Sequence, residues 1–193
     1  MARSKSGGGA RTQAVAIELL ESDHRKVEML FEQYEEEKEG DEETKRSIAE
    51  RICKELTAHA QLEEELFYPW LRENLDEEEM EMVEEAYVEH ASAKDLIAQI
   101  EAGGNIDGAY DAKVKVLQEY IKHHVEEEEN EIFEAVSDKQ EELDALGQEM
   151  HARKAELMEQ LGLMDAEMME MAAQQEGGRG KRGNSQGAQR GSR

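Results

Sequence analysis

The chain has 193 residues, which is long enough for one domain with a substantial core and flanking segments. Its single cysteine, Cys53, excludes an intramolecular disulfide and fits a reducing compartment. No apolar run approaches the roughly 20 residues that span a bilayer, so a membrane protein is not expected. One proline and an abundance of Glu, Leu, Met, Ala and Lys favour an all-α fold.

The net charge of −25 is unevenly distributed along the chain. Residues 1–13 and 177–193 contain basic residues and no acidic ones, so the segment between them has 15 basic against all 48 acidic residues, a net charge of −33. Such a body should repel nucleic acid and anionic membrane and attract cations. Both glycine-rich ends, 1–13 and 177–193, are expected to be disordered tails. The N-terminus shows no signal peptide, so a cytoplasmic location is expected.

Four helical segments are expected between the tails, because each carries one apolar stripe at alternating three- and four-residue steps. They lie at about 14–38, 44–74, 77–101 and 107–136. The breaks between them are short and polar, as antiparallel neighbours require. The sequence therefore predicts an antiparallel up-down-up-down four-helix bundle over residues 14–137.

Several single residues refine these boundaries. Asp76 and Asp107 are placed to cap the third and fourth helices. Pro69 should end or kink the second helix near its C-terminal end. The second stripe is predicted to continue through Leu66 and Trp70.

A fifth helical segment is predicted at residues 138–176, as a C-terminal extension of the bundle. Its apolar stripe runs through Leu143, Leu146, Met150, Leu157, Leu161, Met164 and Met168. We expect this segment either to pack across the bundle or to bind a partner protein, together with the tail that follows it.

Polar residues occupy core positions in all four bundle stripes. A histidine stands there in each, at His24, His59, His90 and His124. In two stripes a glutamate follows one turn later on the same face, at Glu63 and Glu128. The histidines are 35, 31 and 34 residues apart, about one helix plus one loop, so the bundle should bring all four to one height.

Buried polar groups are costly unless they are paired or bound to metal, so these residues predict a metal site in the core. Imidazole and carboxylate together suit iron, manganese or zinc. Two glutamates among four histidines suggest carboxylates that bridge two metal ions and leave a position for dioxygen or another small ligand.

The sequence around these residues resembles the hemerythrin, or HHE cation-binding, family over about residues 15–136. The resemblance is carried by ELLESDHRKVEMLF, HAQLEEELFYP, EEAYVEHASAKDL and HHVEEEENEIF. It implies a centre of two non-heme iron ions and the handling of dioxygen, iron or nitric oxide. The metal ligands that it implies are His24, His59, Glu63, His90, His124 and Glu128.

The sequence departs from hemerythrin proper at three positions. Lys94 stands where a fifth histidine ligand is found in that protein. Glu128 follows its histidine by four residues, where an aspartate follows by five. Glu134 replaces a proline that is frequent in the family. Reversible oxygen carriage is therefore less well supported than metal binding.

Three functions remain open at this point. The histidine-rich ligand set favours a protein that binds dioxygen or a related diatomic for storage, delivery or sensing. The alternatives are a peroxidase or nitric-oxide-reducing enzyme, with Lys94 as a proton donor, and a metal-stabilised scaffold that acts through residues 138–193.

The remaining histidines, glutamates, tyrosines and the cysteine are expected to have no role in metal binding. His123 is expected at a helix–helix boundary or at the surface, His151 at the surface, and Cys53 in the core. Glu64, Glu65 and the glutamates around Glu128 are expected to face solvent. The tyrosines are expected at the edge of the core rather than at the metal site.

Overall fold

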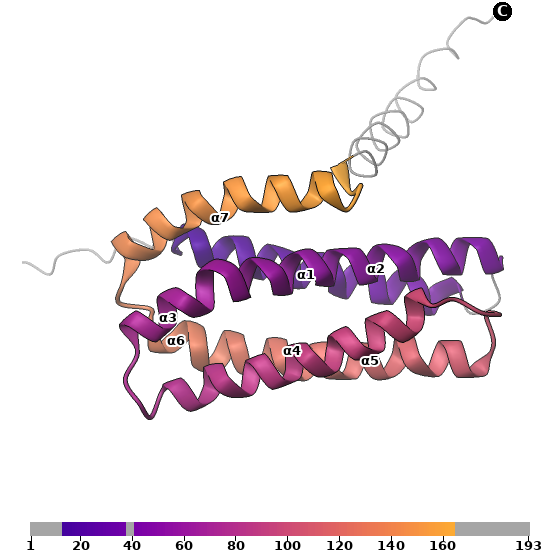
Figure 1. Ribbon diagram of the computed structural model, residues 1–193, viewed down its shortest axis with the longest axis horizontal. Helices are drawn as coiled ribbons and strands as arrows, with labels where there is room; N and C mark the ends of the chain where they lie inside the picture. The colour runs from indigo at the N-terminus through magenta and orange to yellow at the C-terminus, as the bar shows by residue number, and fades with distance from the viewer. Residues whose placement is uncertain (1–12, 38–40, 165–193) are drawn as a thin grey trace, which may run out of the picture.

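The computed structural model describes residues 13–37 and 41–164, and the regular structure in these residues is helical (Figure 1). The predicted tails lie outside the described residues apart from Gln13, and so do residues 165–176 of the predicted fifth segment. The helices are α1 (Val15–Glu36), α2 (Glu42–Leu62), α3 (Tyr68–Asn74), α4 (Met80–Glu101), α5 (Gly108–Glu127), α6 (Phe133–Ala135) and α7 (Gln140–Gln160). Two π-helical turns, Glu63–Phe67 and Glu128–Ile132, join α2 to α3 and α5 to α6.

Four helical rods run in alternating directions and form the predicted antiparallel bundle (Figure 1). α1 packs on α2, α2 on α4, and α4 on α5. Asp107 caps α5 as predicted, because its side chain accepts hydrogen bonds from the backbone N–H groups of Ala109 and Tyr110, both at 3.0 Å. Asp76 accepts from Glu78 and Glu79 in the turn before α4. The sequence therefore predicted the fold class and topology correctly.

Pro69 does not end the second rod, which continues to Asn74. The proline stands in the first turn of α3, directly after the π-helical turn Glu63–Phe67. A proline lacks the N–H that an α-helix interior uses, and the first turn of a helix is where that loss is tolerated. The irregularity in this rod is the π turn before the proline.

The two π turns change which residues enter the core. A π turn contains about one residue more than an α turn, so the residues that follow it are rotated by roughly 100° relative to an uninterrupted helix. The predicted core residues Leu66 and Trp70 are therefore only half-buried, and so is Ala135 after the second π turn. The core positions are taken instead by Phe67, Tyr68, Leu71, Phe133 and Val136.

α7 extends the bundle as a fifth helix that packs along α1 and α2 (Figure 1). Leu143, Met150 and Leu157 are buried in this contact. Asp144 accepts a hydrogen bond of 2.9 Å from the backbone N–H of Val15, at the start of α1. The described part of the predicted fifth segment thus packs across the bundle.

The apolar core has two parts. One contains Leu20, Leu62 and Phe133 and includes the contact with α7. The other contains Val27, Phe31 and the buried free thiol of Cys53. Among the described residues, no helix is long and apolar enough to cross a membrane. A polar layer, described below, lies between the two apolar parts.

Gly147 provides a test of the α7 contact. A Cβ atom at this position would lie 2.6 Å from the backbone nitrogen of Ala16 and 2.8 Å from the backbone carbon of Val15. Because these are backbone atoms, α7 would have to shift away. We expect Gly147→Ala to lower the free energy of unfolding by about 1–3 kcal/mol, measured by urea denaturation.

Gly108→Ala is the matched control. Gly108 is also helical, but an added Cβ there would meet nothing within 4 Å. Alanine is the better helix former, so this variant should be as stable as the parent or slightly more so. Equal stability of both variants would show that the close contact of α7 with α1 does not contribute.

Candidate metal centre

All six residues predicted as metal ligands meet in one buried layer of the bundle. His24 comes from α1, His59 from α2, His90 from α4 and His124 from α5, and the two glutamates begin the two π turns. Each of the six is at most 6% exposed, although all carry polar or charged groups. The burial is what the sequence pattern predicted for side chains on the inward stripes.

The four histidines form two pairs. The Nε2 atoms of His24 and His59 are 3.2 Å apart, and those of His90 and His124 are also 3.2 Å apart. Nitrogen atoms this close need either one proton or one cation between them. Each pair therefore presents two imidazole nitrogens to the same point in the core.

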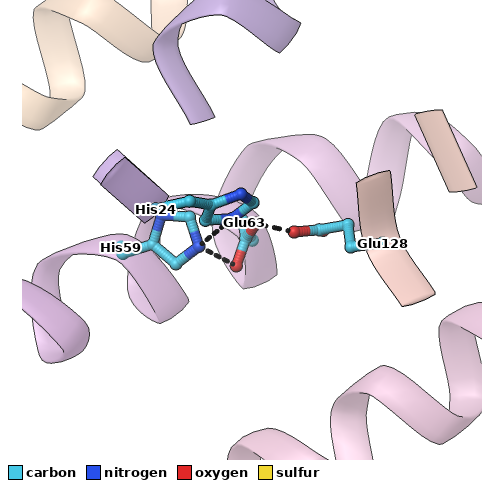
Figure 2. A group of neighbouring side chains, drawn as sticks. All are labelled: His24, His59, Glu63 and Glu128. Atoms are coloured by element: carbon cyan, nitrogen blue, oxygen red, sulfur yellow. Dashed lines mark hydrogen bonds and ion pairs between the residues drawn. The ribbon is translucent and has the colours of Figure 1, made fainter. Parts of the chain in front are cut away.

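Glu63 and Glu128 contact histidines of both pairs, and Figure 2 shows them with the pair His24 and His59. Oε2 of Glu63 is 3.2 Å from Nε2 of His59 and 3.3 Å from Nε2 of His90. Oε2 of Glu128 is 3.2 Å from Nε2 of His24 and 3.9 Å from Nε2 of His124. Each carboxylate thus faces one histidine from each of the two pairs.

These donor atoms make two overlapping groups. His24, His59, Glu63 and Glu128 offer ligand atoms that all lie within 4.8 Å of one another, and so do Glu63, His90 and His124. Glu63 belongs to both groups. A carboxylate with two oxygens that is shared by two ligand groups is suited to bridging two cations.

The protein by itself does not satisfy the polar atoms of this layer. Both carboxylate oxygens of Glu63 and Oε2 of Glu128 are buried and have no hydrogen-bond partner among the described residues. Such atoms are costly in a protein interior. Imidazole nitrogens and carboxylate oxygens are ligands for iron, zinc and manganese, so the donor set fits a metal ion.

A ring of four further carboxylates surrounds the histidines and was missed by the sequence analysis. Each lies next in sequence to one of the six core residues and contacts the histidine of a neighbouring helix through Nδ1. Glu129 is 2.8 Å from His24, Asp23 is 3.6 Å from His59, Glu64 is 3.0 Å from His90 and Glu89 is 2.9 Å from His124. Successive residues of a helix point about 100° apart, which turns each of these acids toward the next helix.

This ring fixes the orientation of the imidazoles. A carboxylate at Nδ1 keeps the proton on that nitrogen, so the lone pair of Nε2 points into the core, as in metal sites. The prediction that Glu64 and Glu129 face solvent is therefore wrong, since both are half-buried and hold a histidine. An acid directly beside four of the six core residues, His24, Glu63, His90 and Glu128, was the signal in the sequence that could have identified the ring.

Tyr68 also reaches the centre, in contrast to the expectation for the tyrosines. It is fully buried, with its hydroxyl 3.3 Å from Nε2 of His90 and 3.5 Å from Oε1 of Glu128. Burial and the charges of Glu63 and Glu128 raise the pKa of Tyr68 well above its ordinary value, so the phenol keeps its proton. The π turn at Glu63–Phe67 brings Tyr68 to the inward face.

Lys94 and His123 lie outside the layer. The ammonium of Lys94 contacts both carboxylate oxygens of Glu64 at 2.6 Å, and its side chain is 44% exposed. His123 is exposed, as expected, and so is His151. His124 is therefore the inward histidine of its helix.

A cavity of about 20 Å³ opens on the four imidazoles. Its walls include the apolar side chains of Val27, Leu56, Ala93, Ile97, Ile121 and Val125. A cavity that holds one water molecule needs about 10–15 Å³, so this cavity has room for a very small molecule. The carboxylates Glu63 and Glu128 are not part of its lining.

Opposite charges hold the layer together in the absence of metal. Burial by itself would lower the pKa of His59, but Glu63 and Asp23 outweigh it and raise that pKa well above its ordinary value. Burial would raise the pKa of Glu63, yet His59 and His90 hold it well below the usual range. Protonated imidazoles therefore offset the buried carboxylates when no metal does so.

Comparisons with known proteins agree with this architecture. The family model of the hemerythrin HHE cation-binding domain matches residues 15–136. A crystal structure of a hemerythrin HHE cation-binding domain-containing protein from Mycobacterium kansasii matches with a TM-score of 0.61 and 22% identity, over 76% of this chain and 87% of that one. At this identity the match shows a shared fold.

A second relative was found by sequence. A DNA nickase from Nostoc sp. (strain PCC 7120) is 29% identical over 147 residues, which are 75% of this chain and 40% of that protein. The chain thus spans less than half the length of this relative.

The charge arrangement predicts how the stability of the metal-free protein depends on pH. The raised pKa of His59 stabilises the fold fully below the unfolded value of about 6.5, and this contribution is lost as pH rises through the folded-state pKa. The lowered pKa of Glu63 stabilises the fold fully above about pH 4.5, its unfolded value. This contribution is lost as pH falls through the folded-state pKa. We expect the free energy of unfolding of chelator-treated protein to decrease from about pH 6.5 upward.

Urea denaturation at a series of pH values between 6 and 9 measures this dependence. The metal-loaded protein is the control, because a metal ion requires neutral imidazoles and should remove the loss of stability at high pH. Stability of the metal-free protein that increases over this range would contradict the assigned charge states.

Proposed function

Because the chain belongs to the hemerythrin HHE cation-binding domain family, we propose that it binds two non-heme iron ions in the bundle core and through them binds dioxygen or a related diatomic molecule. The proposed ligands are the six residues of the core layer, His24, His59, Glu63, His90, His124 and Glu128. Iron would supply the affinity for a diatomic ligand that protein side chains lack.

The observation that carries this proposal is the division of the donors into two groups that share Glu63. A single ion would need one set of four to six donors around one point. Here the His24–His59 pair and the His90–His124 pair converge on separate points, with a carboxylate of Glu63 facing both. This arrangement supports one ion per histidine pair and a bridging role for Glu63.

The choice of a small apolar ligand is supported by the cavity at the imidazoles. Its volume of about 20 Å³ suits a very small molecule, and side chains such as Val27, Leu56 and Ile97 give the cavity apolar walls. The lining also contains Lys94, but its ammonium is held by Glu64. This weakens the alternative of an enzyme that uses Lys94 as a proton donor.

The other partner predictions remain part of the proposal. A protein partner for residues 138–193 and a cytoplasmic location are expected on the grounds given by the sequence. Nicking of DNA is named for the Nostoc relative, of which this chain covers 40%. The strongly acidic body of the present chain favours no such activity, because nucleic acid is recognised mainly through positive charge.

Metal content is the direct test of the proposed centre. Protein loaded anaerobically with Fe(II) and purified in air should contain about two irons per chain, with absorption bands in the near-ultraviolet. His59→Ala should lose iron and bands together. His151→Ala is the matched control, since this exposed histidine lies on α7, outside the layer. Equal iron content in the parent and His59→Ala would refute the assignment.

Access of the small ligand can be tested separately from metal binding. Ala93 is buried and lines the cavity, so Ala93→Val should reduce its volume without touching a proposed ligand. We expect unchanged iron content and a slower reaction of the reduced protein with dioxygen, by about tenfold or more, in stopped-flow absorbance. Ala98→Val adds the same group on the exposed face of α4 and should react like the parent. Identical rates for both variants would exclude the cavity as the binding place.

A further inference from the structure

Three of the four outer carboxylates are braced by cations that differ in origin and depth. Arg25 contacts Glu129 and Lys94 contacts Glu64; both belong to the bundle, and their side chains are 52% and 44% exposed. Lys154 comes from α7 and is 18% exposed, and it contacts Oδ1 of Asp23. Since water and salt screen exposed charges, the charge of Lys154 acts on the centre with the least screening of the three.

Asp23 is shared between this lysine and a histidine of the core layer. Its other oxygen, Oδ2, lies 3.6 Å from Nδ1 of His59, which is longer than a normal hydrogen bond. The other three outer carboxylates lie 2.8 to 3.0 Å from their histidines. The carboxylate that is held from outside the bundle is thus the one that contacts its histidine most weakly.

From these contacts we propose that α7 is a functional part of the metal centre, with Lys154 as a positioning residue that draws Asp23 away from His59 and limits how strongly His59 donates electrons to the metal. This inference rests on the proposed metal centre and adds a means by which a helix outside the bundle tunes it. The family match ends at residue 136, so α7 lies outside the matched region.

The packing of α7 holds Lys154 in place. Gly147 lies against the backbone of α1 so closely that a side chain would not fit. Asp144 accepts a hydrogen bond from the first N–H of that helix. Because α7 is held by these contacts, the ammonium of Lys154 stays next to Asp23.

Two effects of Lys154 act in the same direction. Its positive charge near the centre disfavours the more highly charged, oxidised metal. Its hold on Asp23 weakens the contact at Nδ1 of His59, and a weaker contact there makes the imidazole a poorer donor. Loss of the lysine charge should therefore stabilise the oxidised state of bound iron and lower the reduction potential.

The test is a redox titration of the iron-loaded full chain, followed by absorption, in the parent and in Lys154→Met. We expect a lower midpoint potential in the variant. At the parent midpoint, the ratio of oxidised to reduced protein should increase by about tenfold, an effect of the same order as the changes in metal affinity that follow loss of an outer partner of a metal ligand. Lys154→Arg keeps the charge and the contact and should restore the parent potential.

Arg153→Met is the matched control. It removes the same charge from the adjacent residue and breaks one ion pair between α7 and the bundle, but Glu65 contacts none of the proposed ligands. A purely structural loosening of α7 would affect both methionine variants alike. Only Lys154→Met should change the potential.

Asp23→Asn tests the direction in which the reduction potential changes. It remains informative if Lys154→Met folds poorly. It removes the negative charge from the same contact, so the potential should rise rather than fall. A shift of both variants in one direction, or a potential of Lys154→Met equal to that of the parent, would overturn the proposal. Iron content separates the two proposals, because a parent chain that binds no iron refutes the metal centre and this inference together.

Discussion

The burial of four imidazoles and two carboxylates in one layer is the constraint on which the rest of the structure depends. Among the described residues, the buried carboxylate oxygens of Glu63 have no hydrogen-bond partner, so the layer is stable only with compensating positive charge. Protons on the histidines provide that charge without metal, and metal ions would provide it with the histidines neutral. The same chemistry thus lets the fold persist without metal and makes the layer suited to binding cations.

The outer carboxylates convert this layer into an organised centre. Each of them comes from one helix and holds the histidine of the next, so that the ring connects α1, α2, α4 and α5 in turn. The orientation of the imidazoles therefore depends on the relative placement of all four helices. α7 enters this arrangement through Asp23, and any coupling between its docking and the metal must by thermodynamic linkage act in both directions.

The π turns link local backbone geometry to chemistry. Each begins at a glutamate of the core layer, and the change of phase after it carries Tyr68 and Phe133 to the inward face. With a regular α-helix, Tyr68 would point roughly 100° away from His90. The two π turns thus decide that the phenol of Tyr68 and the ring of Phe133 enclose the centre.

The sequence by itself determined the helical fold, the four-helix topology and the inward position of the six polar core residues. This was possible because a 3.6-residue period and a turn of four residues are local properties, readable along one helix at a time. Only the tertiary structure decided the pairing of the histidines, the role of Asp23, Glu64, Glu89 and Glu129, and the entry of Tyr68 into the centre. These features depend on contacts between helices and on where a π turn falls. An acidic residue next to a histidine looks the same in sequence whether it faces water or the imidazole of a neighbouring helix.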